Sequence, residues 1–249
     1  QGINESGKKF INLGICPTPA IPFLIREENM SSGIMISASH NEHSDNGIKF
    51  FGPDGYKLSD SVELEIEALV SKGIGYVSPE DIGRAKRIDD GRYRYIERVK
   101  SSFPNQMRLD GLKVVIDCAN GAGYKAAPEV LWELGAEVIP VGVSPDGRNI
   151  NLDCGSTNPT VAAETVVAHG ADVAICLDGD ADRVLIIDEY GRPIDGDQFL
   201  GMIGSRWFKN GNLVENTLVS TVMSNMGLEA FLKQEGIKLV RTSVGDRYV

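Results

Sequence analysis

The sequence predicts an α/β protein made of consecutive three-layer α/β/α units with mixed, mostly parallel sheets. Strand-like and helical patterns alternate along residues 112–188, and this βαβαβ order is typical of a sheet covered by helices. The strand-like runs, such as LKVVIDC at 112–118, are apolar on both faces, which indicates strands buried in a parallel sheet. The alternation begins again after residue 197, so the chain contains two α/β units and the start of a third.

The first unit has two expected strands on either side of a polar loop. Residues 33–38 form a short apolar run, the loop spans 39–46, and residues 47–51 return as a second strand before a Gly-Pro-Asp-Gly turn. Residues 59–66 place a hydroxyl and a carboxylate ahead of apolar residues at helical spacing, which predicts a capped amphipathic helix.

The second and third units follow the same alternation of short strands and helices. The third unit reaches residue 249 without the further strands that would close its sheet. We expect strands at 112–118, 137–141, 172–177, 183–188, 218–220 and 237–241, a tight turn at 121–123, and helices through 130–134, from about 159 to 169, and at 197–208 and 228–234.

Composition excludes several classes of function. The 249 residues carry 35 acidic and 25 basic side chains, a net charge of −10, which argues against nucleic acid or an anionic membrane as the main partner. No apolar run approaches the ~20 residues of a membrane span. The first residues, QGIN, are neither a start methionine nor a signal peptide. The four cysteines are far apart without a CxxC pair, so we expect reduced thiols in a cytoplasmic protein.

The strongest chemical signal is DGDADR at 178–183, directly after an apolar strand. Asp178, Asp180 and Asp182 alternate along the loop, so in extended backbone their carboxylates project to one side. Three such carboxylates repel one another unless a cation neutralises them, and an all-oxygen set suits Mg²⁺. Ligands also gather at the carboxyl ends of strands in open α/β sheets. The alternative is a solvated acidic turn, but the buried strands on both sides favour a metal site.

A second signal is SASHN at 37–41, between the two strands of the first unit. Ser39 and His40 are adjacent, so in extended backbone their side chains point apart and His40 is poorly placed as the base of an acyl-transfer serine. A polar turn is an equally good interpretation. Lys49 lies inside an apolar strand, where a charge is costly unless it meets an anion or protects a sheet edge.

A third, weaker signal is the loop containing Gly245, Asp246 and Arg247, which follows the last expected strand. A glycine-bearing loop with an arginine is able to hold a phosphate or sugar hydroxyls, although an ordinary surface loop fits the same residues.

Together these loops resemble the α-D-phosphohexomutase superfamily, whose hallmarks are a serine loop of the form SASHNP or TGSHNP and a metal loop DGDxDR. SASHN at 37–41 and DGDADR at 178–183 stand in that order, about 140 residues apart. Within the superfamily, the run GIMISASHNEHSDNGIKFF and the closing VGDRYV are most similar to the bacterial phosphoglucosamine mutases. Glu42 stands where the family usually has proline, which loosens the loop but removes no reactive group.

The resemblance implies four domains, of which this chain holds the C-terminal part of domain 1 (1–104, serine loop), domain 2 (105–196, metal loop) and the N-terminal part of domain 3 (197–249). The chain is then a fragment that begins after the family's N-terminal substrate arginine. It ends before the sugar-selecting loop and the phosphate-binding fourth domain. On that basis we expect little mutase activity from the chain alone.

The resemblance also implies a mechanism. Ser39 carries a phosphoryl group, and Asp178, Asp180 and Asp182 hold Mg²⁺ together with a phosphate oxygen on Ser39. Glucosamine 6-phosphate is converted to glucosamine 1-phosphate, for amino-sugar nucleotide and cell-wall precursor synthesis. Glucosamine 1,6-bisphosphate, or another hexose bisphosphate, is the intermediate and activator.

Further roles follow from the same resemblance. Arg183 helps to neutralise charge, and Lys49 and His40 are candidates for the base; Lys49 needs a depressed pKa for this role. Gly245, Asp246 and Arg247 are expected to bind substrate.

Alternatives are a phosphoglucomutase or phosphomannomutase of the same superfamily, a non-catalytic sugar-phosphate or metal-binding module, and a metal-dependent phosphatase with an aspartate nucleophile. The expected partner is a small sugar phosphate, with no nucleic acid and no membrane, and a homodimer is a candidate assembly.

Overall fold

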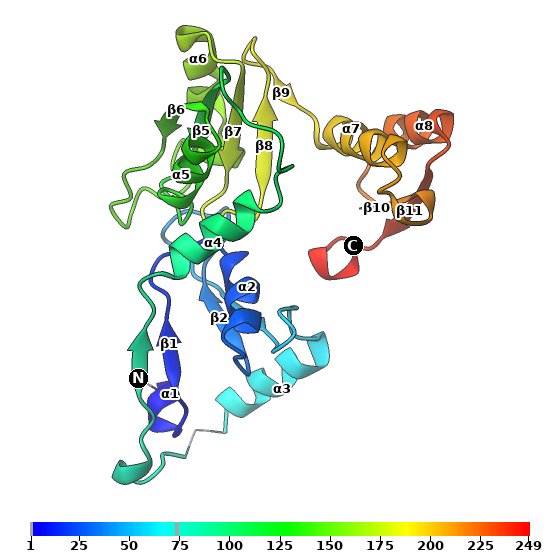
Figure 1. Ribbon diagram of the computed structural model, residues 1–249. Helices are drawn as coiled ribbons and strands as arrows, with labels where there is room; N and C mark the ends of the chain where they lie inside the picture. Colours follow the sequence, from blue (N-terminus) through cyan, green and yellow to red (C-terminus); the bar gives the residue numbers. More distant parts are fainter. Residues whose placement is uncertain (1, 73–74) are drawn as a thin grey trace.

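The computed structural model describes residues 2–72 and 75–249, and of Asp246 only the backbone. Three α/β units follow one another along the chain, and each contains at least one pair of strands (Figure 1). The pairings are mixed, so the fold class predicted from the sequence is confirmed. Within the described ranges, none of the helices has the length and apolar character that crossing a membrane requires.

The first unit contains the two expected strands, β2 and β3, which pair antiparallel. A second pair, β1 with β4, is parallel and was not predicted. Helix α2 packs on β2 so closely that a Cβ on Gly33 would lie 2.5 Å from the Ile25 side chain. The elements are α1 (Gly2–Glu5), β1 (Phe10–Asn12), α2 (Ala20–Glu27), β2 (Gly33–Ile36), β3 (Ile48–Phe51), α3 (Asp60–Val70), β4 (Ala85–Arg87) and α4 (Gly91–Lys100).

Helix α3 differs from the capped amphipathic helix that the sequence predicts in its cap and its burial. Ser59 occupies the N-cap position, but its hydroxyl lies 2.9 Å from the hydroxyl of Ser61 and caps no backbone N–H. No side chain of α3 is buried among the described residues. The helix therefore lies on the surface, and its acidic first turn is free to meet charges from elsewhere.

The second unit is a five-stranded sheet in the order β6-β5-β7-β8-β9. Strands β6, β5 and β7 are parallel, whereas β8 and β9 are antiparallel to their neighbours, because a short loop cannot provide the crossover that a parallel neighbour requires. Helix α5 packs on β5 and β6, and α6 on β5 and β7. The elements are β5 (Lys113–Asp117), α5 (Ala126–Glu133), β6 (Glu137–Val141), α6 (Thr160–His169), β7 (Val173–Leu177), β8 (Val184–Ile187) and β9 (Pro193–Ile194).

The third unit pairs β10 and β11 in parallel, with α7 and α8 packed against each other. Asp195 and Gln198 form a capping box at the start of α7, and the Asn225 side chain caps α8. These caps satisfy backbone donors that have no partner inside a helix. The elements are α7 (Gly196–Lys209), β10 (Thr217–Thr221), α8 (Met226–Glu235) and β11 (Lys238–Thr242).

All four cysteines are free and buried, in agreement with the expected reduced thiols. Burial raises the pKa of Cys16 and Cys154 to about 11, and of Cys118 and Cys176 to about 12. The thiolate forms are therefore disfavoured, and these side chains act as packing groups.

Two glycines bring the loop after β5 against the loop after β7. The N–H of Ala122 donates to the carbonyl of Gly179 at 2.7 Å, and a Cβ on Gly121 would lie 2.1 Å from that carbonyl oxygen. Backbone atoms cannot move aside as a flexible side chain can. Glycine at 121 therefore fixes how closely the DGDADR loop sits on the turn that follows β5.

We predict that Gly121→Ala lowers the free energy of unfolding by about 1–3 kcal/mol, because the two loops must separate to admit a methyl group. Thermal or urea unfolding measures the effect. Gly196→Ala at the start of α7 is the control, since a Cβ there meets nothing within 4 Å in the described structure. Equal unfolding midpoints for Gly121→Ala and the unchanged protein would show that this contact is not tight.

Candidate functional site

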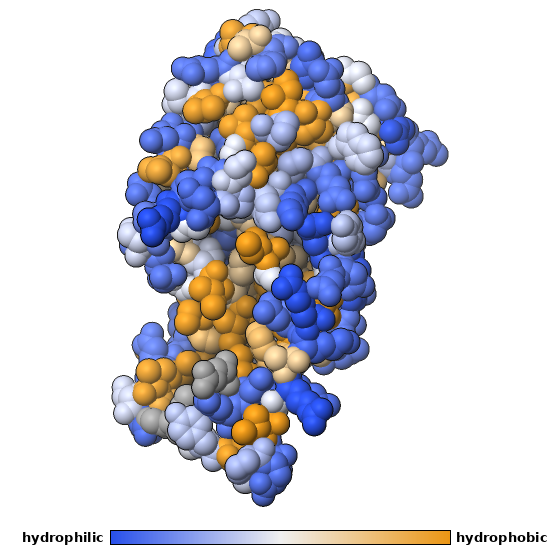
Figure 2. Space-filling view, turned by 90° about the vertical axis from the view of Figure 1, so that its left-hand side faces the viewer, coloured by the Kyte–Doolittle hydropathy of each residue, from blue (hydrophilic) through white to orange (hydrophobic). Residues whose placement is uncertain are grey.

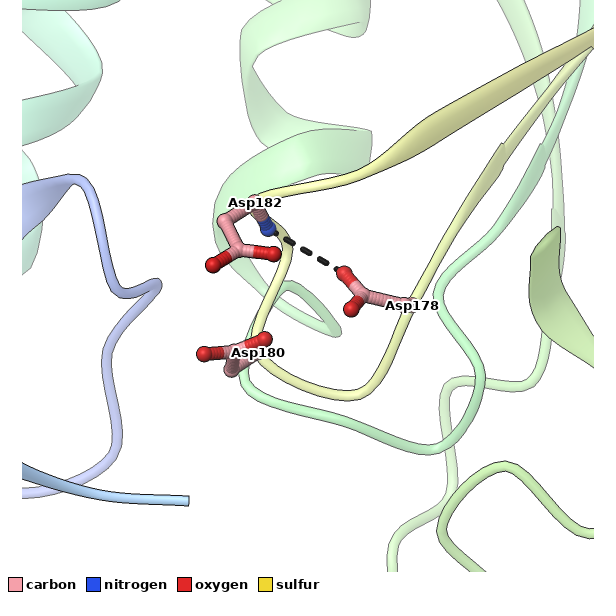
Figure 3. A group of neighbouring side chains, drawn as sticks. All are labelled: Asp178, Asp180 and Asp182. Carbon is pink, nitrogen blue, oxygen red and sulfur yellow. Dashed lines mark hydrogen bonds between the residues drawn. The ribbon is translucent and has the colours of Figure 1, made fainter. Parts of the chain in front are cut away.

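The DGDADR segment forms the hairpin loop between β7 and β8 and gathers its three carboxylates (Figure 3). One oxygen from each of Asp178, Asp180 and Asp182 lies within 4.8 Å of the others. The backbone N–H groups of Asp182 and Arg183 both donate to Asp178 Oδ1 at 3.1 Å, which turns the loop around that carboxylate. Asp178 and Asp180 are buried, and Asp182 is open to solvent.

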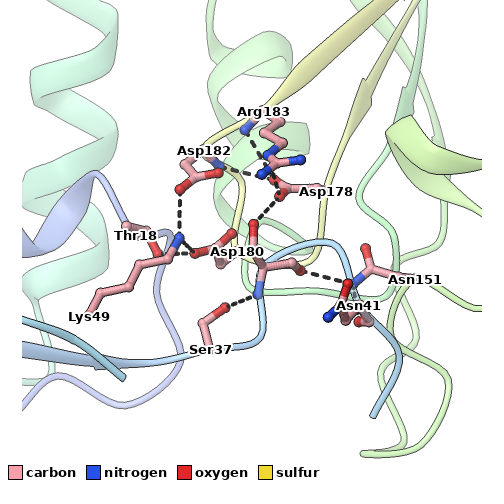
Figure 4. Close-up of polar contacts among 10 residues, drawn as sticks. Thr18, Ser37, Asn41, Lys49, Asn151, Asp178, Asp180, Asp182 and Arg183 are labelled. Atoms are coloured by element: carbon pink, nitrogen blue, oxygen red, sulfur yellow. Dashed lines mark hydrogen bonds and ion pairs between the residues drawn. The ribbon is translucent and has the colours of Figure 1, made fainter. Parts of the chain in front are cut away.

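Ser39 from the first unit meets this loop directly. Figure 4 shows Thr18 and Lys49, from the same unit, reaching Asp180. Its hydroxyl donates to Asp178 Oδ2 at 2.9 Å, across 139 positions of sequence. Ser39 has a φ of +54°, a left-handed conformation that is uncommon for serine, and its N–H donates to the Ser37 hydroxyl at 2.9 Å. The serine loop and the acidic loop therefore form one site.

Lys49 on β3 supplies a positive charge to the same carboxylates. Its Nζ lies 2.5 Å from Asp180 Oδ2 and 2.7 Å from Asp182 Oδ2. Burial acts to lower the pKa of Lys49, but hydrogen bonds and charge from the two aspartates outweigh it, and the pKa is raised. This direction is opposite to the depressed pKa that a proton-accepting role would require.

The buried aspartates differ in their electrostatics. Burial raises the pKa of Asp178, and its hydrogen bonds offset only part of that rise. Burial acts in the same direction on Asp180, but the hydrogen bonds from Lys49 and Thr18 hold the pKa of Asp180 below its ordinary value. Of the two buried carboxylates, Asp180 is thus the one more firmly kept charged.

The residues present fit a hard divalent cation. All the donors are carboxylate oxygens, which is the chemistry that Mg²⁺ or Ca²⁺ prefers. Asp180 Oδ1 is buried and has no hydrogen-bond partner within the part of the chain that the structure describes. A buried charged oxygen without a partner is costly, and a cation would satisfy it. The three aspartates can therefore bind a metal ion.

The other predicted site residues of the serine and acidic loops lie near this centre. His40 follows Ser39, and its Nδ1 is buried without a hydrogen-bond partner in residues 2–72 and 75–249. Arg183 places its Nε 4.0 Å from Asp178 Oδ2, and its side chain is more than half exposed.

The predicted substrate loop of the third unit makes its contacts elsewhere. Arg247 pairs with Asp60 and Glu63 in the acidic first turn of α3. Gly245 has a φ of +138°, which suits glycine, and the side chain of Asp246 lies outside the described residues. The ion pairs of Arg247 therefore direct it to α3 and not to the aspartates of the acidic loop.

Sequence reasoning missed two buried residues that hold the site together. Thr18, just before α2, donates its hydroxyl to Asp180 Oδ2. Asn151 donates its side-chain amide to the carbonyls of Ser39 and Asn41. Thr18 lies between two prolines and Asn151 lies in a polar loop, so neither stands in a pattern with a recognisable chemical meaning.

The site opens to solvent through a groove of about 1480 Å³, whose lining includes Ser39, Gly179 and Asp180. Strands β1 and β2 also line the groove, with exposed Ile34 and Ile36 on β2. Figure 2 shows hydrophobic side chains on one face over the upper half, which the second unit forms, and over the middle and lower part, which the first unit forms. A polar site therefore lies beside an apolar surface.

Comparison with protein families gives three matches in chain order. The family models for phosphoglucomutase/phosphomannomutase alpha/beta/alpha domains I, II and III match residues 1–76, 93–191 and 195–249. A solved phosphoglucomutase/phosphomannomutase family protein from Burkholderia thailandensis superimposes with a TM-score of 0.81 at 20% identity, over 99% of this chain and 54% of that one. At this identity the likeness concerns the fold.

Curated relatives are much more similar in sequence. Phosphoglucosamine mutases from Roseobacter denitrificans and from a Ruegeria species are each 65% identical over 248 residues, and the one from Ruegeria pomeroyi is 58% identical. The alignments cover all of this chain and 55–56% of each relative, so the chain spans about half the length of these relatives. With three consecutive domain models matched and this identity, the chain belongs to the phosphoglucomutase/phosphomannomutase family.

Proposed function

We propose that the protein is a phosphohexomutase that interconverts glucosamine 6-phosphate and glucosamine 1-phosphate through a phosphorylated Ser39. The observation that carries this proposal is the 2.9 Å hydrogen bond from the Ser39 hydroxyl to Asp178 in an acidic, cation-compatible loop. The choice of glucosamine rests on the 65% identical phosphoglucosamine mutases. The whole relatives are nearly twice as long, so the activity is proposed for the complete protein.

The site residues support phosphoryl transfer in named roles. Asp178, Asp180 and Asp182 would hold Mg²⁺, together with an oxygen on Ser39. When bound, the cation supplies positive charge that neutralises the transferring phosphoryl group. An N-acetylphosphoglucosamine mutase from Aspergillus fumigatus, 19% identical with a TM-score of 0.59, was solved with GlcNAc-6P and magnesium, which supports this choice of ion.

In the transfer, a sugar hydroxyl oxygen forms a bond to phosphorus as the bond from phosphorus to Ser39 Oγ breaks. The product is a 1,6-bisphosphate, and its other phosphoryl group returns to Ser39 by the reverse exchange. Lys49 and Arg183 bring positive charge to the acidic loop that Ser39 contacts, and the raised pKa of Lys49 suits a hydrogen-bond donor to phosphate oxygens. The hydroxyl proton needs an acceptor; the raised pKa of Lys49 argues against that residue, which leaves His40 of the two candidates.

The phosphatase alternative stays a prediction. An aspartate nucleophile needs a free oxygen; both oxygens of Asp178 accept hydrogen bonds, whereas Asp180 Oδ1 has no hydrogen-bond partner among the described residues. The non-catalytic module, the other hexose phosphates, the homodimer and the cytoplasmic location stay predictions.

The first test is phosphorylation of Ser39. After incubation of the protein with glucosamine or glucose 1,6-bisphosphate and Mg²⁺, peptide mass spectrometry should find one phosphoryl group on Ser39. It should find none in Ser39→Ala, while Ser44→Ala, in the same exposed loop, is labelled like the unchanged protein. Labelling at another residue, or unchanged labelling of Ser39→Ala, would contradict the proposal.

The second test is metal binding. We expect Asp180→Asn to weaken Mg²⁺ binding at least about tenfold in isothermal titration calorimetry, because a buried charged ligand is lost. Asp188→Asn is the matched control, since Asp188 follows β8 at the far end from the acidic loop and pairs with Arg192. Equal Mg²⁺ affinities for Asp180→Asn and Asp188→Asn would show that Asp180 does not bind the metal ion.

The third test concerns Lys49, whose ammonium occupies the carboxylate oxygens that a metal ion would use. We predict that Lys49→Met tightens Mg²⁺ binding by about tenfold, roughly 1.4 kcal/mol, because the ion no longer competes with a resident positive charge. Lys86→Met on the exposed strand β4 is the control and should leave the affinity unchanged. Weaker Mg²⁺ binding by Lys49→Met would show that Lys49 supports the ion instead of competing with it.

A further inference from the structure

Two buried side chains cross between the first and second units in opposite directions. Thr18, from the first unit, binds the acidic loop of the second. Asn151, from the second unit, binds the serine loop of the first. Each loop of the site is therefore held by a residue from the opposite unit, and these two residues have no assigned role in the chemistry described above.

Thr18 holds Asp180 at two points. Its N–H donates to the Asp180 carbonyl at 2.8 Å, and its hydroxyl donates to Asp180 Oδ2. Thr18 is only 5% exposed, so water cannot replace these contacts easily. The backbone bond fixes the position of the loop, and the hydroxyl fixes the direction of the carboxylate.

Asn151 holds the backbone on both sides of His40. Its Nδ2 donates to the Ser39 carbonyl at 3.0 Å and to the Asn41 carbonyl at 2.8 Å, which uses both amide hydrogens. Asn151 is 6% exposed, and its own N–H donates to the Ala119 carbonyl at 2.9 Å. The opposite amide orientation would set an oxygen against two carbonyls, so the chemistry selects this one.

The acidic loop, the serine loop and Asn151 pack tightly around Gly179. A Cβ on Gly179 would lie 2.6 Å from Asn151 Nδ2 and 2.7 Å from the Ser39 carbonyl oxygen. The acidic loop, the serine loop and Asn151 thus meet at one point. A shift of either loop would break the hydrogen bond between Ser39 and Asp178.

We propose that Thr18 and Asn151 are positioning residues that act as a reciprocal clamp: each fixes the reactive loop of the other unit, and together they hold the Ser39 hydroxyl against the aspartates. Thr18 acts through Asp180 and therefore on cation binding. Asn151 acts through the backbone of Ser39 and therefore on the nucleophile. Their effect on phosphoryl transfer rests on the proposed function, but their effect on loop order does not.

The test measures backbone hydrogen exchange by mass spectrometry in Thr18→Val and Asn151→Ala. We expect Thr18→Val to speed exchange in 178–183 by about tenfold, the scale of a lost hydrogen bond to a buried charge, and Asn151→Ala to do so in 37–43. Thr18→Ser keeps the hydroxyl and should restore protection. Thr165→Val and Asn158→Ala, at half-buried positions outside the two loops, are controls. Faster exchange only around the substituted residue, or no rescue by serine, would overturn the clamp.

Function supplies a second readout on the same variants. Thr18→Val should weaken Mg²⁺ binding about tenfold, whereas Asn151→Ala should slow Ser39 phosphorylation about tenfold with Mg²⁺ affinity within about twofold of the unchanged protein. Parallel losses of both properties in both variants would indicate general destabilisation and contradict the proposal. If the unchanged protein is never phosphorylated on Ser39, the proposed function fails. Hydrogen exchange and Mg²⁺ binding still test whether Thr18 and Asn151 hold the two loops.

Discussion

The crowding of three carboxylates in a largely buried loop is the constraint on which the site depends. Two unit charges 4.8 Å apart repel by on the order of 3 kcal/mol at an effective dielectric constant of about 20, and Asp178, Asp180 and Asp182 contain three such pairs. The loop offsets part of this with its own N–H groups. The rest of the compensation comes from the first unit, through Lys49 and the hydroxyls of Thr18 and Ser39. Electrostatics therefore joins the two units at the same place where their reactive groups meet.

The sequence predicts best the strands and helices whose burial produces a recognisable pattern of apolar residues. Strand 137–141 agrees to the residue, although it lies at the edge of the sheet. The strands near β5 and β7 agree to within one residue, because they lie inside the sheet and their apolar runs end where the strands end. Strands β1 and β4 were missed, since each is three residues long and at most half-buried. Helix α2 was not predicted; it carries Pro22, but a proline in a first turn removes no helical hydrogen bond. Local patterns thus specify the second unit, and tertiary contacts specify much of the first.

The site residues fall into the same two groups: some are predictable from local sequence pattern, and others depend on contacts between distant segments. The three aspartates lie in one short loop, so alternation along the backbone was enough to group them. Lys49 was singled out as a charge that needs an anion, and the anions in this structure are Asp180 and Asp182. The meeting of Ser39 with Asp178 came only from the resemblance to a family, because 139 positions separate them and no local rule connects two loops across a domain boundary.

Strain at the meeting point explains why the two loops must be held from outside. Ser39 and Ala181 both adopt left-handed backbone, at φ +54° and +58°, and this costs about 1–2 kcal/mol for each non-glycine residue. Each loop has one hydrogen bond of its own at this residue, from the Ser39 N–H to the Ser37 hydroxyl and from the Ala181 N–H to the Asp178 carbonyl. The strain persists because hydrogen bonds and tight packing from the opposite unit leave no relaxed alternative. A site of this kind is in place before any ion or sugar binds, and it exists only while the two units stay together.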